Sequence, residues 1–181
     1  MNSDNPDTGK IPAIILYGVL LFAILSRLLP HPMNITSVGA LSLFAGAFLP
    51  IRIAWIAPIT ALLVGDAVTG FYHPVVMLFV YAGFAGGTLV GRLMLVNKRT
   101  MTNLAGSAFI SASIFFVLSN FGMWLSGTYP ATIDGLIDCY IRAIPYFRYS
   151  LLGDIFYTFL LFGSYELVRL IMGRQLLFRS R

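Results

Sequence analysis

Residues 74–96 read PVVMLFVYAGFAGGTLVGRLMLV. This apolar run is long enough to cross a bilayer, because a spanning helix needs about 20 predominantly apolar residues. Gly83, Gly87 and Gly91 recur at four-residue spacing, which places three positions without side chains along one helix stripe. Such stripes let helix backbones approach closely, so the segment predicts a membrane helix that packs tightly against a neighbour.

Five further apolar runs flank this segment. They cover residues 11–29, 37–49, 53–70, 104–125 and 151–172. Run 37–49 reaches only about 20 Å at about 1.5 Å per residue, so a re-entrant helix is the alternative to a spanning one. Pro58 predicts a kink in run 53–70. The runs together predict an all-α, polytopic transmembrane bundle of about six helices, formed by residues 1–181 as a single domain.

The composition supports a membrane protein and argues against a soluble or nucleic-acid-binding one. Hydrophobic residues make up 58% of the chain and charged residues 10%, whereas soluble domains contain about 25% charged residues. The formal net charge is +5, but the twelve Lys and Arg residues lie at the ends of the apolar runs rather than on one basic face. The single cysteine, Cys139, excludes an internal disulfide and is either a small apolar residue of a helix or a free thiol.

The distribution of basic residues predicts the orientation of six crossing segments. One side carries Lys10, Arg52, Arg92, Lys98, Arg99, Arg169, Arg174, Arg179 and Arg181. The other side carries only Arg27, Arg142 and Arg148. Because cytoplasmic loops are enriched in Lys and Arg, we expect both termini in the cytoplasm, with a polar tail at 1–10 and a basic tail at 173–181.

The segment 126–147 differs from the apolar runs. It mixes aspartates, tyrosines, prolines and Arg142, so it is too polar to span and too aromatic for a plain linker. We expect an interfacial loop with a short helix near residues 133–144.

Ionisable residues at membrane depth are costly and usually face a cavity or a partner. Asp66, Asp154 and Glu166 are therefore candidate functional residues. The alternative is that each lies near a membrane surface or pairs with an arginine.

No motif in the sequence points to an enzyme. The chain contains no H-E-x-x-H, no G-x-S-x-G and no G-x-x-x-x-G-K-[ST] pattern, and its two histidines and one cysteine lack zinc spacing. We expect a protein that is not an enzyme and that holds neither a metal nor a cofactor.

Aromatic residues gather on the predicted outer side of the bundle. They are Phe71, Trp124, Tyr129, Tyr140, Tyr146, Phe147 and Tyr149. Two interpretations stay open: these side chains form a membrane-interface belt, or several turn inward and form an apolar pocket with Asn34, Asn120 and Arg142 as sparse polar anchors.

Two stretches carry a resemblance to known proteins. Residues 34–48, NITSVGALSLFAGAF, followed by Gly65-Asp66, Gly70 and the glycine-rich run, resemble the substrate-binding S components of energy-coupling-factor (ECF) transporters. Residues 119–124, SNFGMW, and 143–147, AIPYF, are similar to a bacterial family of uncharacterised membrane proteins with that type of fold.

The resemblance implies a protein of the bacterial cytoplasmic (inner) membrane that binds and takes up a small organic molecule, such as a vitamin or cofactor. Its pocket would open outward beneath the loops after the first, third and fifth helices. By position, the implied substrate-binding residues are Asn34, Thr36, Asp66, His73, Asn120, Trp124, Asp138, Arg142 and Asp154.

The resemblance also implies a transmembrane coupling protein with ATPases as partner. S components that share such a module carry small residues at four-residue spacing on the first helix, whereas Ala13, Gly18 and Ala23 are five apart here. A solitary protein or a different partner therefore stays open. The alternative function is an accessory or structural subunit of a larger membrane complex, which packs through the Gly83, Gly87 and Gly91 stripe.

Overall fold

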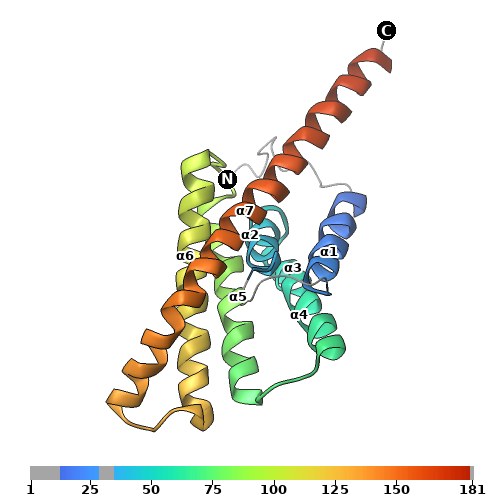
Figure 1. Cartoon of the computed structure of the whole chain (residues 1–181). Helices are drawn as coiled ribbons and strands as arrows, with labels where there is room; N and C mark the ends of the chain where they lie inside the picture. The colour runs from blue at the N-terminus through green and yellow to red at the C-terminus, as the bar shows by residue number, and fades with distance from the viewer. Residues whose placement is uncertain (1–12, 29–34, 180–181) are drawn as a thin grey trace.

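The computed structural model describes residues 13–28 and 35–179, and every regular element within them is a helix (Figure 1). The elements are α1 (Ala13–Leu28), α2 (Val38–Phe48), α3 (Ile51–Ala54), α4 (Ile56–Thr69), α5 (Pro74–Met94), α6 (Met101–Met123), the π-helical turn η1 (Trp124–Thr128) and α7 (Ile133–Arg179). Because α3 leads into α4 and η1 continues α6, the described chain forms six helical segments. The predicted all-α bundle is confirmed.

Four segments are long and apolar enough to cross a membrane. They are Ile51–Thr69, Pro74–Met94, Met101–Thr128 and Ile133–Ile171. The protein is therefore a membrane protein. Helix α2 has 11 residues and a length of about 16 Å, which is short of a roughly 30 Å hydrocarbon core. The number of crossings and the cytoplasmic placement of both termini stay predictions.

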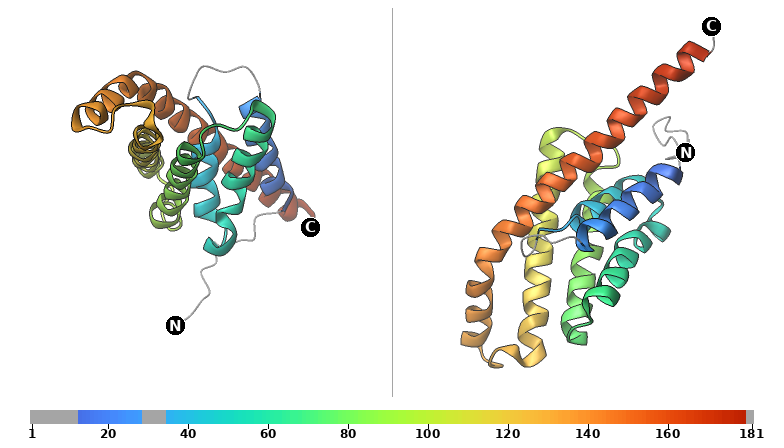
Figure 2. Two further views of the ribbon diagram at one scale, coloured as in Figure 1. Left: turned by 90° about the horizontal axis from the view of Figure 1, so that it is seen from below. Right: turned by 45° about the vertical axis from the view of Figure 1, so that its right-hand side comes forward.

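Helix α2 lies at the centre of the bundle. It contacts each of the other α-helices, and every residue from Val38 to Ala47 is buried. Its sequence, VGALSLFAGAF, contains no charged residue and many small ones, so neighbouring helices can approach on all sides. Figure 2 shows α1 and α4 beside one flank of α2, α5 and α6 beside the other, and α7 crossing the bundle diagonally.

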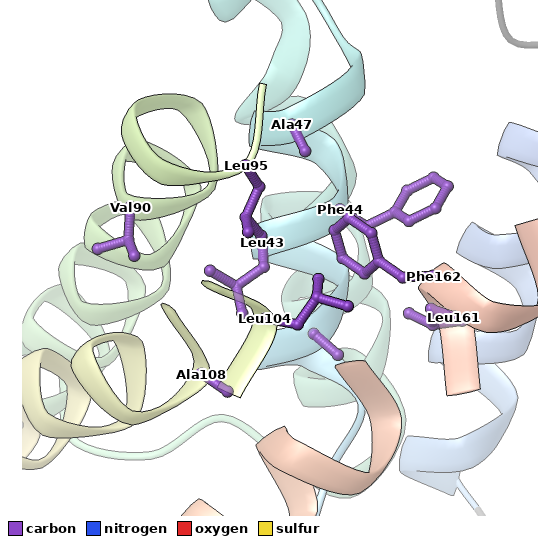
Figure 3. Packing of buried hydrophobic residues seen from close by; sticks show 10 residues of the cluster. Leu43, Phe44, Ala47, Val90, Leu95, Leu104, Ala108, Leu161 and Phe162 are labelled. Atoms are coloured by element: carbon purple, nitrogen blue, oxygen red, sulfur yellow. The ribbon is translucent and has the colours of Figure 1, made fainter. Parts of the chain in front are cut away.

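The core is built on adjacent residues of α2 that face different neighbours. Leu43 belongs to a buried cluster with Val90 of α5 and Ala108 of α6 (Figure 3). The ring of Phe44 packs edge-on against Phe162 of α7, with the centroids 5.4 Å apart. Helix α2 thereby joins the α5–α6 pair to α7.

The three glycines of the predicted stripe on α5 contact other helices of the same chain. A Cβ added at Gly83 would lie 3.1 Å from the Cα of Phe115 on α6. One added at Gly87 would lie 2.6 Å from Ser111 Oγ on α6, and one at Gly91 would lie 2.8 Å from the Cα of Leu43 on α2. The stripe therefore lets α5 approach both α2 and α6.

The helix that contains Pro58 is interrupted at Trp55, between α3 and α4. A proline has no N–H, so Pro58 cannot donate the helical hydrogen bond to the carbonyl of Ala54. The interruption lies where the sequence predicts a kink.

The prediction of an interfacial loop at 126–147 with a short helix near 133–144 is wrong in extent, since a helix does begin there but does not end. Helix α7 begins at Ile133, where the hydroxyl oxygen of Thr132 accepts a hydrogen bond from the N–H of Gly135 at 3.1 Å, and it continues past Pro145 to Arg179. The polar residues of this segment argue against a long membrane helix. They are accommodated because Cys139 and Tyr140 donate hydrogen bonds to backbone carbonyls of α6. The predicted tail at 173–181 is likewise helical as far as Arg179.

The connections lie at two ends of the bundle. The turn from α6 through η1 into α7 and the connection from α4 to α5 lie at one end, and the connection from α5 to α6 lies at the other (Figure 1). The C-terminal part of α7 extends well beyond the other helices on the second side.

Candidate functional site

A pocket of about 650 Å³ lies between α5, α6 and α7. Its lining residues come from the first half of α5, the second half of α6, the turn after η1 and the N-terminal part of α7. They are Val76, Val80, Phe115, Phe116, Ser119, Asn120, Met123, Tyr129, Cys139, Arg142, Ala143, Tyr146, Phe147 and Ser150. This volume and this mixture of apolar walls with a few polar groups are typical of small-molecule sites.

One face of α7 forms the pocket wall. Cys139, Ala143, Phe147 and Ser150 follow one another at spacings of four, four and three residues, which keeps them on the same side of a helix. Two hydrogen bonds attach this region to α6. The Cys139 thiol donates to the backbone carbonyl of Asn120 at 3.4 Å, and the Tyr140 hydroxyl donates to the carbonyl of Val117 at 2.7 Å.

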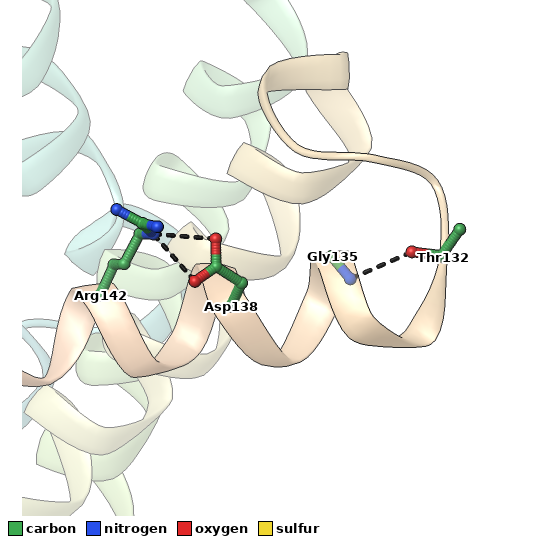
Figure 4. A network of polar contacts seen from close by, with 4 residues as sticks. All are labelled: Thr132, Gly135, Asp138 and Arg142. Atoms are coloured by element: carbon green, nitrogen blue, oxygen red, sulfur yellow. Dashed lines mark hydrogen bonds and ion pairs between the residues drawn. The ribbon is translucent and has the colours of Figure 1, made fainter.

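Arg142 is the cationic group of the pocket. Its Nε donates to both carboxylate oxygens of Asp138, at 2.9 and 2.8 Å (Figure 4). The pair is exposed, so solvent screens it and it contributes little to stability. The terminal nitrogens of Arg142 make no hydrogen bond to the described residues, and one of them points away from Asp138. Asp138 therefore orients a guanidinium that still has donors for an anionic group.

Asn120 and Trp124 have different roles at the same end of α6. The Asn120 amide nitrogen donates to the carbonyl of Phe116 at 2.8 Å, and the residue lines the pocket. The indole of Trp124 donates to the carbonyl of Pro130 at 2.9 Å. Trp124 is thus absent from the lining and instead holds the turn that leads to α7.

Asp154 lies deeper on the same face of α7. The residue is 7% exposed, and its carboxyl group lies against the Cα of Gly39, where a Cβ would collide with it. Gly39 is in the first turn of α2. Within the described part of the chain no hydrogen bond reaches the Asp154 carboxyl group, and the buried hydroxyl of Thr158, one turn further along α7, has no partner either.

The other predicted site residues lie away from the pocket. Thr36 is half-buried beside Gly153. Asp66 is fully buried and accepts a hydrogen bond from the Tyr81 hydroxyl at 2.9 Å. His73 is exposed, and its Nδ1 accepts a hydrogen bond from the N–H of Val75 at the start of α5. Asn34 lies outside the described residues. The structure thus brings Asn120, Asp138 and Arg142 together, whereas Asp66 and His73 are separate from them.

Glu166, the third ionisable candidate, lies 3.7 Å from Arg169 in an exposed pair on α7. Among the described residues, no group of three His, Cys, Asp or Glu side chains is close enough to hold a metal ion.

Sequence reasoning missed several lining residues. They include Phe116, Ser119, Ala143 and Ser150. Small or polar residues recur at helical spacing at 139, 143, 150, 154 and 158, with Phe147 on the same face, and this pattern carried the signal. The signal is clear only when residues 133–158 are taken as one continuous helix, whereas the sequence predicts a short helix near 133–144 that is separate from the last apolar run.

The fold and the pocket define a helical membrane protein with a cavity between three of its helices. Residues 8–175 match a family of unknown function, DUF6580, and the chain belongs to this family. The predicted likeness to an uncharacterised membrane protein family is confirmed to that extent. No curated protein and no solved structure matches the chain.

Proposed function

We propose that this protein binds a small organic molecule in the pocket between α5, α6 and α7 and takes part in its uptake across the membrane. The observation that carries the proposal is the pocket itself, about 650 Å³ of space with aromatic walls and a few polar groups. The pocket is a cleft that opens to the surface of the bundle, so a ligand can reach it without a rearrangement of the helices.

The lining indicates the chemistry of the ligand. Phe115, Phe116 and Phe147 offer ring faces for a flat apolar body, and Phe116 and Phe147 pack with their centroids 5.0 Å apart. Arg142 suits a carboxylate or another anionic group, while Asn120 can hydrogen-bond a polar substituent. A vitamin-like molecule with an aromatic or apolar body and one acidic group fits this description.

The position of the pocket favours uptake. The pocket lies toward the end of the bundle that contains the α4–α5 connection and η1, which is the side that the basic residues predict to face outward. A binding site near the outer surface of a bacterial inner membrane would capture its ligand from outside. The likeness to ECF S components suggests that a coupling protein with ATPases supplies the energy, and this assignment belongs to the proposal.

The alternative function is an accessory subunit that packs through Gly83, Gly87 and Gly91, but this stripe is not available to a partner protein. Those glycines face α2 and α6 of the same chain. A partner complex would have to use another face of the bundle.

Native mass spectrometry of the protein extracted from its own membranes in mild detergent tests the proposal. The matched variants are Ala143→Phe, which inserts a ring into the pocket, and Leu152→Phe, which adds one to an exposed apolar position of the same helix. We expect a stoichiometric small molecule on the wild type and on Leu152→Phe, and its loss from Ala143→Phe. Stoichiometric polypeptides without a small molecule on the wild type would favour the accessory-subunit function instead.

A further inference from the structure

A line of polar residues runs from the pocket into the bundle along α7. Ser150 lines the pocket and is 8% exposed, Asp154 is 7% exposed and Thr158 is fully buried. They follow at four-residue spacing, so successive side chains lie one above the other, with Cβ atoms about 6 Å apart. The pocket wall is therefore continuous with a buried carboxyl group near the middle of the longest candidate span, Ile133–Ile171.

No described side chain neutralises Asp154. The carboxyl group lies on Gly39 of α2, and α2 contains no titratable residue. Residues 35–37, which pack beside Gly153, contain none, and α6 also contains none. Tyr157 is the nearest titratable residue along α7. Helix α5 contains two titratable residues: Tyr81 donates a hydrogen bond to Asp66, and Arg92 is exposed.

The position over α2 suits a negative charge. The backbone N–H groups in the first turn of a helix lack intrahelical partners, and the helix dipole makes this end positive. Gly39 has no side chain, so the carboxyl group approaches this end closely. An ionised carboxylate still requires further compensation in the apolar interior of a membrane protein, where isolated charges are costly.

Thr158 provides an independent observation. Its hydroxyl oxygen is buried and has no hydrogen-bond partner in the described structure. Buried polar groups are nearly always satisfied, so the orphaned hydroxyl of Thr158, one turn from the Asp154 carboxyl group, indicates a missing partner at this position. Carboxylate and hydroxyl oxygens are the ligands that hard cations prefer.

We infer that Asp154, together with the hydroxyl group of Thr158, forms a site for a monovalent cation, a proton or Na⁺, whose occupancy is linked to ligand binding in the adjacent pocket. The linkage, though not the cation site itself, rests on the proposed function. Ser150 provides the physical connection, because it belongs to the pocket wall and lies one turn from Asp154. A cation at Asp154 would cancel the buried charge beside the pocket and favour a bound anionic ligand there.

The sodium arm of the test measures the thermal unfolding midpoint of the full chain in lipid nanodiscs. NaCl replaces choline chloride at constant ionic strength. A ligand that binds only the native state raises the midpoint with its concentration, so we expect a rise for the wild type and none for Asp154→Asn. Thr158→Val should show a smaller rise and Thr158→Ser should resemble the wild type. Asp134→Asn, an exposed aspartate of the first turn of α7, is the matched control and should respond fully.

The proton arm uses difference infrared spectra of the same samples at acidic and alkaline pH. If the occupant is a proton, the band of a protonated carboxyl group disappears on alkalinisation in the wild type and in Asp134→Asn, and it is missing from Asp154→Asn. A sodium response or this titration, lost specifically with Asp154, supports the site and identifies the cation. The inference is overturned if Asp154→Asn behaves like the wild type in both arms.

Pocket variants separate the cation site from the proposed function. Ala143→Phe should lose the organic ligand and keep the cation response, whereas loss of both would move the cation into the pocket and refute the assignment to Asp154. In the opposite test, Asp154→Asn should retain less of the copurified small molecule than Asp134→Asn. Equal retention would refute the linkage and leave the proposed function standing.

Discussion

Substituting Gly91 by alanine tests the close packing of α5 on α2. The added Cβ would lie 2.8 Å from the Cα and 2.9 Å from the carbonyl carbon of Leu43, and closer still to its carbonyl oxygen. These are backbone atoms of the central helix, so the clash cannot be relieved by a side-chain rotation. Overpacking costs about 1–3 kcal/mol, and contact with backbone favours the upper end. Alanine recovers about 1 kcal/mol of helix propensity, so the expected net loss is about 2 kcal/mol.

Gly106→Ala is the matched control. Gly106 lies inside α6, and a Cβ there would meet only the terminal methyl group of Met94, at 3.9 Å. This substitution should stabilise the protein by about 1 kcal/mol through helix propensity alone. The same chemical change therefore has opposite signs at two positions, with a difference of about 3 kcal/mol.

Equilibrium unfolding in mixed micelles with increasing dodecyl sulfate, followed by far-ultraviolet circular dichroism, measures both variants. Gly91→Ala should unfold at a lower fraction of dodecyl sulfate than the wild type, and Gly106→Ala at a higher one. If both variants shift in the same direction, the packing of Gly91 against Leu43 does not limit stability and the reasoning fails.

Three further expectations follow from the site. Arg142→Gln should weaken retention of the copurified ligand about tenfold in native mass spectrometry, because it removes a charge-assisted hydrogen bond to the acidic group of the ligand. Arg148→Gln, at an exposed position outside the pocket lining, should leave retention unchanged. Tyr140→Phe removes the hydrogen bond to the Val117 carbonyl and should lower the free energy of unfolding by about 1 kcal/mol in the dodecyl sulfate titration. An unchanged midpoint would show that this bond does not hold α7 to α6. In sodium-free buffer, Thr158→Val should leave the free energy of unfolding unchanged or raise it by about 1 kcal/mol, since valine removes an unsatisfied buried hydroxyl. A clear loss of stability would mean that the hydroxyl has a partner.

Much of the fold follows from residue patterns along the chain. Apolar runs bounded by charges and prolines indicate the helical segments, and the interruption at Trp55 lies three residues before Pro58. A short helix was expected near residues 133–144, but its continuation through Pro145 into the last apolar run was not predicted, because Asp138, Arg142 and Pro145 are unusual in a membrane helix. Asp138 and Arg142 are tolerated there because they pair at i, i+4 on an exposed face.

The candidate site was predicted only in part. Asn120 and Arg142 were selected as polar residues among aromatics, and both line the pocket. Whether an aromatic residue faces lipid or a cavity depends on the rotation of its helix, which composition does not determine. The members of the aromatic group differ in this respect, since Tyr146 lines the pocket and Phe71 is 64% exposed, while the membrane-interface belt stays a prediction.

The sequence alone determined that this chain is a helical membrane protein, because the bilayer requires apolar segments whose backbone hydrogen bonds are satisfied within the segment. Only the tertiary structure decided that the short segment Val38–Phe48 becomes the buried centre, and that α5, α6 and α7 line an open pocket with Asp154 beneath it. The reason is that apolar helices are equally compatible with lipid and with one another. Their arrangement depends on where glycines such as Gly39 and Gly91 allow two backbones to meet, and this is a property of pairs of helices rather than of one segment.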